Sequence, residues 1–213
     1  MSLAIIHTRA RLGIDAPPVT VEVHLSNGLP SLSIVGLPET AVKESKDRVR
    51  SALINSQFEF PARRITINLA PADLPKDGSR FDLAIAIGIL AASDQVPKDK
   101  LSHVEFIGEL ALSGELRGVD GILSAVIVCG ASKRALVIAD DNAAQAALCK
   151  NAVVYRAKNL LEVCSHLHEQ NRLTKVPFSP PIYSPAVLDF NEVQGQYTAK
   201  RALEIAAAGG HNI

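Results

Sequence analysis

Several residue types are scarce or absent in this sequence. Aromatic residues make up 4% of the 213 positions, tryptophan is missing, and 22 basic residues balance 22 acidic ones. A chain without net charge has no overall attraction for nucleic acid or acidic lipid, so any such binding must come from a local patch. The hydrophobic content of 47% is that of an ordinary globular protein. A length of 213 residues is enough for one large domain and a small additional unit.

The cysteines and histidines are too few and too scattered to predict a disulfide framework or a metal site. Cys129, Cys149 and Cys164 are odd in number, widely spaced and set in apolar surroundings. They are expected to be small core residues of a reduced compartment. His166 and His168 are two positions apart on a predicted helix, so they face different sides and predict no metal site.

Targeting and membrane signals are also missing. The first residues have neither the charged lead nor the apolar run of a signal peptide. No stretch reaches the ~18 uninterrupted apolar residues that a membrane span requires. The sequence therefore predicts a cytoplasmic protein with no membrane partner.

The first half of the chain alternates apolar and polar residues. This pattern predicts strands over residues 3–10, 19–25, 31–36 and 65–69. Between the last two, Pro38 opens a helix that is expected to reach about residue 55.

The second half alternates strands and helices. Strands are expected over 104–112, 115–117, 135–139 and 153–155, and helices over 122–131, 142–149 and 160–170. This order indicates β-α-β crossovers over a mixed sheet, which is an α/β fold.

The most informative stretch lies between the two halves. Residues 71–78 are rich in proline, aspartate and glycine, as loops are, and residues 83–92 are an apolar run of the length of a buried helix. Asp77, Gly78 and Ser79 fall where that helix is expected to begin. Unpaired N–H groups at a helix start donate hydrogen bonds to bound anions or stabilise an oxyanion. The pattern alone favours an ordinary loop before a capped buried helix.

The tail has a different composition. Residues 175–185 hold four prolines, which predicts a stiff linker or a chain that lies across a surface. A helix is expected over 197–208, closed by two glycines. We therefore expect a domain over 1–172, a linker over 173–187 and the start of a further module over 188–213.

Two motifs resemble those of Lon-type proteases. Pro75-Lys76-Asp77-Gly78 before an apolar helix is similar to the Pro-Lys-Asp-Gly-x-Ser motif, in which the serine is the nucleophile. The position of that serine is occupied here by Arg80, and Ser79 is one residue early. The resemblance thus implies a protease scaffold without its nucleophile.

The second motif concerns the catalytic lysine. Residues 108–116 resemble the Lon hairpin, and the lysine of that family follows a Gly-Gly-Leu on the next helix. Matching Asp120-Gly121-Ile122 to that tripeptide places Leu123 at the lysine position, and Lys133 is too far along the helix to substitute. Because a lysine base works only when it is desolvated beside its serine, the resemblance implies no catalytic residue.

The tail resembles the entry of an AAA+ ATPase module. Val193, Gln194 and Gly195 match the segment that borders the adenine, and residues 209–212 resemble the lead into the Walker A strand. No Gly-x-x-x-x-Gly-Lys-Ser/Thr motif is present, so we expect no cofactor in these residues and ATP with Mg²⁺ only in a longer protein.

Taken together, the motifs resemble the ComM group of magnesium-chelatase-like AAA+ proteins in content and order. The matching segments are residues 35–40, 42–44, 47–52 and 68–76. This resemblance implies a bacterial hexameric helicase that uses ATP to drive DNA branch migration in natural transformation. The chain is then its N-terminal Lon-like domain, non-proteolytic and used for DNA contact or ring assembly. The alternatives are an ATPase or adaptor subunit of a magnesium-chelatase-like system and a Lon-type Ser–Lys peptidase.

Under this resemblance, basic residues become candidates for contact with branched or single-stranded DNA. They are Lys43, Lys46, Arg50, Arg63, Arg64, Lys76 and Arg80. The first three share a face of the expected helix, which on its own is typical of a solvated surface. Glu44 is expected to pair with Arg48, four residues on.

Overall fold

The computed structural model describes residues 2–181 and 189–213, which fall into two compact units that divide between Pro180 and Pro181. The larger unit is built on an eight-stranded mixed sheet with the order β10-β9-β8-β5-β1-β2-β4-β3. The strands are β1 (Ser2–Arg9), β2 (Pro18–Ser26), β3 (Ser31–Val35), β4 (Arg64–Ala70), β5 (Val104–Phe106), β8 (Ala135–Ala139), β9 (Val153–Ala157) and β10 (Thr174–Lys175). The predicted α/β fold class is confirmed.

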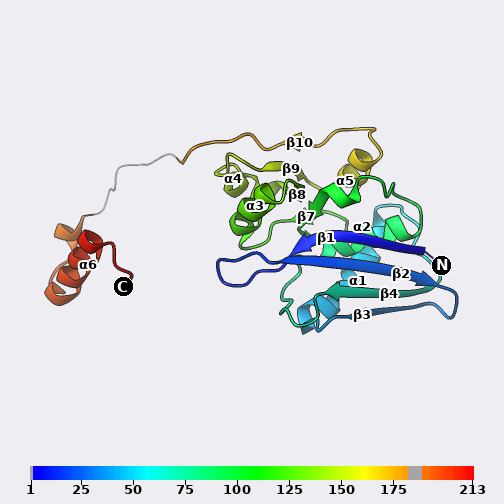
Figure 1. Cartoon of the computed structure of the whole chain (residues 1–213), viewed down its shortest axis with the longest axis horizontal. Coiled ribbons are helices and arrows are strands. Elements are labelled where there is room, and N and C mark those ends of the chain that lie inside the picture. Colours follow the sequence, from blue (N-terminus) through cyan, green and yellow to red (C-terminus); the bar gives the residue numbers. More distant parts are fainter. Residues whose placement is uncertain (1, 182–188) are drawn as a thin grey trace. The chain divides into compact units, whose positions relative to one another are not determined.

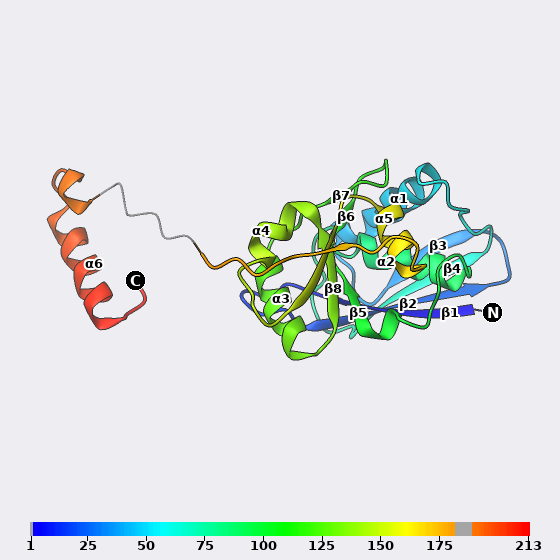
Figure 2. The same cartoon turned by 90° about the horizontal axis from the view of Figure 1, so that it is seen from above.

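Helices cover the two faces of the sheet unequally (Figures 1 and 2). One face is covered by α1 (Thr40–Asn55), α2 (Asp82–Ala92) and α5 (Leu160–Leu167), whose buried residues form one core with the sheet. On the other face, α3 (Ile122–Ala131) and α4 (Ala143–Ala146) pack on the half that holds β5, β8 and β9.

The alternation of the first-half strands explains this layering. In β4, the side chains of Ile65, Ile67 and Leu69 are buried against the α1 and α2 layer. Because side chains alternate along a strand, Arg64 and Thr66 lie on the opposite face. Register agrees with the pattern, since Ile65 pairs with Leu25 on the neighbouring β2.

Helix α2 is buried along its whole length and rests directly on β1 and β2. Gly88 permits this close approach, because a Cβ atom added there would lie 2.5 Å from Cγ2 of Val23 and 3.3 Å from Cγ1 of Ile6. The predicted buried helix is thus confirmed, and it begins at Asp82, three residues after Ser79.

The strand expected over 104–112 is divided in two. After β5, Gly108 turns toward α2, where its N–H donates to the Arg80 carbonyl and its own carbonyl accepts from the Leu83 N–H, both at 3.1 Å. The chain then forms β6 (Glu109–Leu110), which pairs with β7 (Leu116–Arg117) as a separate two-stranded ribbon. The hairpin was predicted, but the break at Gly108 was not.

The end of the larger unit also differs in detail from the sequence pattern. The helix expected over 142–149 is the single turn α4, preceded by the 3₁₀ turn η2 (Asp140–Asn142). Thr174 and Lys175, within the expected linker, pair with β9 as the edge strand β10. Residues 182–188 of that linker lie outside the described residues.

The smaller unit contains the 3₁₀ turn η3 (Phe190–Glu192) and helix α6 (Tyr197–Gly209), which agrees with the helix expected over 197–208. In the larger unit, a further 3₁₀ turn, η1 (Leu101–His103), precedes β5. Within residues 2–181 and 189–213, no helix combines the length and apolarity needed to traverse a bilayer.

Candidate functional site

A cavity of about 430 Å³ lies at the loop that precedes α2. Its lining comes from residues 11–13, residues 77–80, Glu109 and residues 118–120. The strand directions explain this meeting, because β4 runs in the same sense as β1, and β5 is parallel to β1. The residues that follow these three strands therefore leave the sheet at one edge.

Ser79 is not equipped as a nucleophile. Its hydroxyl donates a hydrogen bond to the Glu109 carboxylate, which also lies 3.7 Å from the Arg117 guanidinium. A serine nucleophile needs an adjacent base, such as a desolvated lysine or a histidine, and here its partner is an ion-paired carboxylate.

Arg80 occupies the position of the nucleophile in the resembling motif and points into the domain. The residue is only 4% exposed, and its Nη1 donates to the Asp120 carbonyl at 3.4 Å. Nε and Nη2 are buried and have no partner among the described residues. Burial lowers the pKa of Arg80 to about 10, with Arg11 acting in the same direction and Asp120 against it.

The lysine position of the resembling motif is equally unsuited to catalysis. Leu123 lies in the first turn of α3 and carries no ionisable group. Lys133 is exposed beyond the other end of α3, which is ten residues and so ~15 Å long. Neither residue is placed to act as a base toward Ser79, and the loss of the Ser–Lys pair stays a prediction from the motifs.

A buried ion pair lies at the start of α2, two residues after Arg80. The Asp82 carboxylate at the start of α2 has no exposed side-chain surface and accepts from Arg48 Nε at 2.8 Å, from the Ser45 hydroxyl and from the Leu110 N–H at 3.3 Å. Burial raises the pKa of Asp82, while the bonds from Arg48 and Ser45 oppose that rise. The expected Glu44–Arg48 pair exists at 3.9 Å, but this distance is longer than the 2.8 Å between Arg48 and Asp82.

Three of the predicted basic residues form a stripe along α1, which we call the α1 stripe: Lys43, Lys46 and Arg50. Lys43 and Arg50 are exposed and Lys46 is half-buried, and none of the three makes an ion pair within 4 Å of its charge among the described residues. The Arg50 guanidinium lies 5.0 Å from the centroid of the Phe60 ring, a cation–π contact that orients it.

The other predicted bases are dispersed. Arg63 is exposed just before β4 and lines a separate recess with Asp94, and Arg64 lies on the sheet face opposite α1. Lys76 is fully buried, with its ammonium donating to the carbonyls of Pro71 and Leu74. Burial lowers the pKa of Lys76. The structure therefore brings together only the α1 stripe and places Lys76 and Arg80 in the interior.

The predicted adenine-bordering residues lie in the smaller unit. Val193 and Gln194 are exposed and Gly195 is half-buried, between η3 and α6. No cluster of three or more histidine, cysteine or acidic residues with metal-binding geometry occurs in the described parts of the chain.

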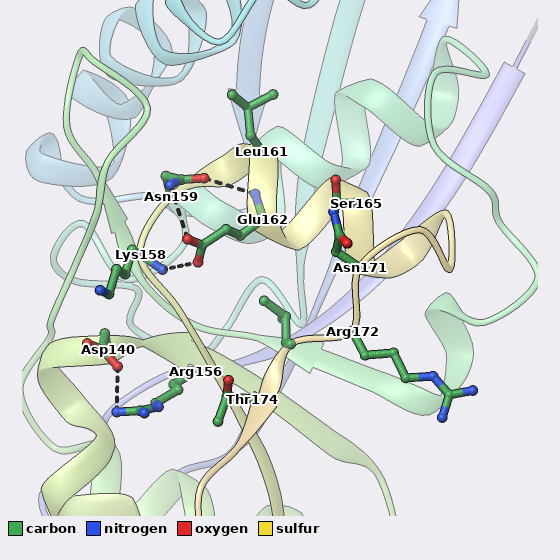
Figure 3. Close-up of a pocket in the computed structure, with 11 residues that line it drawn as sticks. Asp140, Arg156, Lys158, Asn159, Leu161, Glu162, Ser165, Asn171, Arg172 and Thr174 are labelled. Carbon is green, nitrogen blue, oxygen red and sulfur yellow. Dashed lines mark hydrogen bonds and ion pairs between the residues drawn. The ribbon is translucent and has the colours of Figure 1, made fainter.

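A second cavity, of about 500 Å³, lies between the ends of β9 and β10 and helix α5 (Figure 3). Four of its polar side chains have structural partners: Arg156 pairs with Asp140 at 3.1 Å, Glu162 accepts from the Lys158 N–H at 2.8 Å, and the Asn159 side chain bonds to Glu162. Asn159 caps α5 by accepting from the Glu162 N–H. The long side chains of Lys158 and Arg172 point away from each other, so they do not converge on a ligand.

Comparison with known proteins identifies the family. A family model described as subunit ChlI of Mg-chelatase matches residues 21–142, more than half of the chain, and a second, for magnesium chelatase subunit ChlI, matches residues 189–213. Competence protein ComM of Haemophilus influenzae is 53% identical over the whole chain, which covers 43% of that protein. Uncharacterized protein YifB of Salmonella typhimurium is also 53% identical, with 42% covered, and uncharacterized protein Mb2921c of Mycobacterium bovis is 36% identical, with 42% covered.

The α/β fold and the two matching family models define the class as a magnesium-chelatase-like AAA+ protein. Within that class, the chain belongs to the ComM family, as its motifs predicted. The chain spans less than half the length of these relatives. The family assignment suggests the use of ATP and Mg²⁺ within the family.

Proposed function

We propose that this chain is the N-terminal, non-proteolytic domain of a hexameric AAA+ helicase that uses ATP to drive DNA branch migration in natural transformation. Membership of the ComM family supports the motor, and the name of the Haemophilus relative connects that protein with competence. In this proposal the domain acts in the cytoplasm and contacts branched or single-stranded DNA through the α1 stripe.

The observation that carries the DNA contact is the arrangement of the α1 stripe. Lys43, Lys46 and Arg50 lie three and four residues apart, so they occupy one side of a regular helix. Their charges have no acidic partner within the described residues, which leaves them available for phosphate oxygens. Asp47 lies on the same side of α1 and lowers the positive potential without removing it.

Arg63 and Arg64 are kept in the proposal as secondary contacts. Because Arg64 lies across the sheet from α1, a straight segment of DNA on the α1 stripe does not reach it. These two arginines would instead meet a second strand of a branched substrate. With about four phosphates contacted in all, log affinity is expected to fall against log salt with a slope of about −3 to −4.

The nucleotide site belongs to the longer protein in this proposal. Val193, Gln194 and Gly195 would border the adenine, and the phosphate-binding loop and Mg²⁺ ligands would come from residues that the present chain does not contain. The helix that follows, α6, supports this placement because it lies within the segment matched by the second family model.

Two observations weigh against the alternatives. Arg80 and Leu123 at the positions of the protease nucleophile and base oppose peptidase activity, so we expect no covalent labelling of Ser79 by a serine-directed reagent. For the chelatase alternative, the described parts of the chain contain no cluster of three or more histidine, cysteine or acidic side chains that could hold a metal ion. Labelling that disappears in Ser79→Ala would reverse the first conclusion.

The experiment that tests the proposal is branch migration by the longer protein that contains this domain. The variant Lys43→Gln, Lys46→Gln, Arg50→Gln removes the α1 stripe, and Lys133→Gln, Lys150→Gln, Arg172→Gln removes the same charge elsewhere. We expect the first to slow branch migration at least ~10-fold at moderate salt and the second to leave it near wild type. Equal rates for both variants would show that α1 has no contact with DNA, and would favour a role in ring assembly.

A further inference from the structure

Arg80 is a buried cation without a counter-charge in contact. Two of its three nitrogens, Nε and Nη2, lack any partner among the described residues, and the third makes only a long 3.4 Å bond to a carbonyl. Its pKa of about 10 still keeps it protonated at neutral pH. A buried charge in a folded protein is normally paired, so this arrangement points to a missing negative partner.

The acidic side chains around the cavity do not supply that partner. The Asp120 carboxylate is 96% exposed and lies 3.9 Å from Arg11. Glu109 is engaged by the Ser79 hydroxyl and by Arg117. Asp77 is exposed at the rim of the cavity. Of the groups that line the cavity, none neutralises Arg80 by direct contact.

We infer that this cavity binds a small ligand with a free carboxylate, which pairs with the Arg80 guanidinium. The planar edge formed by Nε and Nη2 matches the two oxygens of a carboxylate, which accepts both bonds in parallel. The cavity, at about 430 Å³, has room for a ligand the size of an amino-acid residue.

Access to these nitrogens involves residues 118–121, which begin and end with a glycine and lie directly before α3. The segment lines the cavity, and its Asp120 carbonyl holds Nη1 through the long bond. Glycines stand at both ends of it, and Gly121 has a φ of 69°, a conformation that glycine adopts freely. A shift of this carbonyl uncovers the guanidinium, and the ligand carboxylate then replaces the weak bond with two charge-assisted ones.

The charge of the rim selects the class of anion. Three carboxylates at the rim, Asp77, Glu109 and Asp120, outnumber its one cation, Arg11, and so repel a phosphate dianion more strongly than a carboxylate monoanion. The same three carboxylates accept hydrogen bonds, which favours a ligand that carries N–H groups beside its carboxylate. A free acylated amino acid and the carboxyl end of a peptide share this chemistry.

Calorimetric titration of the 213-residue chain tests the inference. N-acetylglycine is the probe, N-acetylglycinamide is its neutral control, and a tripeptide with a free or an amidated carboxyl end distinguishes a small acid from a chain end. We expect binding of the free acids only, weakened at least ~10-fold in Arg80→Met, since two bonds to a charged group are lost. Arg172→Met, an exposed arginine outside the cavity, should bind as wild type does.

A thermal scan keeps the test decisive. Without ligand, Arg80→Met should melt at or above the wild-type temperature, because an unpaired buried charge is gone, and added acid should raise the melting temperature of the wild type alone. Equal binding of the amide, binding of inorganic phosphate or of a single-stranded oligonucleotide in place of the acids, or no binding to wild type at 50 mM acid would each overturn the inference. Loss of DNA affinity in the α1 stripe variant leaves it intact, so the two proposals fail separately.

Discussion

Arg80 and Asp82 are both buried charged residues at the start of α2, but they differ in the number of their hydrogen-bond partners. Asp82 is buried and has partners from α1 and from β6, whereas Arg80, two residues earlier, is buried almost without partners. A carboxylate that joins three elements holds the start of α2 in place. Arg80 makes no comparable set of bonds between elements, and it lines the cavity instead.

The Asp82 pair should be important for stability. Asp82→Asn leaves Arg48 without its main partner, and we expect the free energy of unfolding to fall by about 3 kcal/mol. Urea denaturation measures the change, with the exposed Asp99→Asn as the matched control. A loss no larger than that of the control would mean that Arg48 and Ser45 hold α1 to α2 without the carboxylate.

His7 should make stability depend on pH. Burial lowers the pKa of His7, and Arg134 acts in the same direction while Glu105 opposes it. The unfolded chain therefore binds the proton first, near pH 6.5, and stability falls as the pH drops from there through the lowered pKa. His166 shifts in the same direction through burial, Arg172 and Lys100.

Urea denaturation at pH 7.5 and at successively lower pH values checks this expectation. His7→Gln should show a shallower decline below pH 6.5 than wild type does. A steeper decline in the variant, or rising stability on acidification, would contradict the assignment.

At the scale of elements, the contact between α2 and the sheet organises the fold. Gly88 sets the distance, because its missing side chain lets the helix rest on Val23 and Ile6. Gly88→Ala gains about 1 kcal/mol of helix propensity, but it inserts a methyl group into a closed contact, so we expect a net loss of about 1–2 kcal/mol.

A double-mutant cycle isolates that contact. Val23→Ala removes the atom nearest to the added methyl group, and the double variant should lose less stability than the sum of the two single variants. Additive losses would place the strain of Gly88→Ala elsewhere in the core.

The elements themselves could be predicted where the signal is local. Alternation in β2 and the apolar run of α2 are complete within a few residues, and both were confirmed. The break after β5 was missed because it depends on bonds between Gly108 and the start of α2, about 25 residues away in sequence. The same limit hid the pairing of Arg48 with Asp82, since the local partner Glu44 looked sufficient.

At the scale of the molecule, the family was readable from motifs, but the candidate site was only partly so. The prediction that the protease nucleophile and base are missing rests on Arg80 and Leu123 alone, and it stays a prediction. The burial of Lys76 does not, because a lysine in a polar loop looks exposed until its ammonium is found between two carbonyls. The cavity itself depends on three parallel-running strands that end at one edge, which only the sheet order reveals.

The central claim is that the α1 stripe contacts DNA phosphates in the motor. The most direct test is the salt dependence of DNA affinity, measured by fluorescence anisotropy on the longer protein with a branched substrate. We predict a slope of about −3 to −4 for wild type and for the Lys133, Lys150, Arg172 control, and a slope flatter by about two to three units when Lys43, Lys46 and Arg50 are all changed to glutamine. An unchanged slope in that variant would contradict the claim, because each lost phosphate contact must lower the number of released counterions.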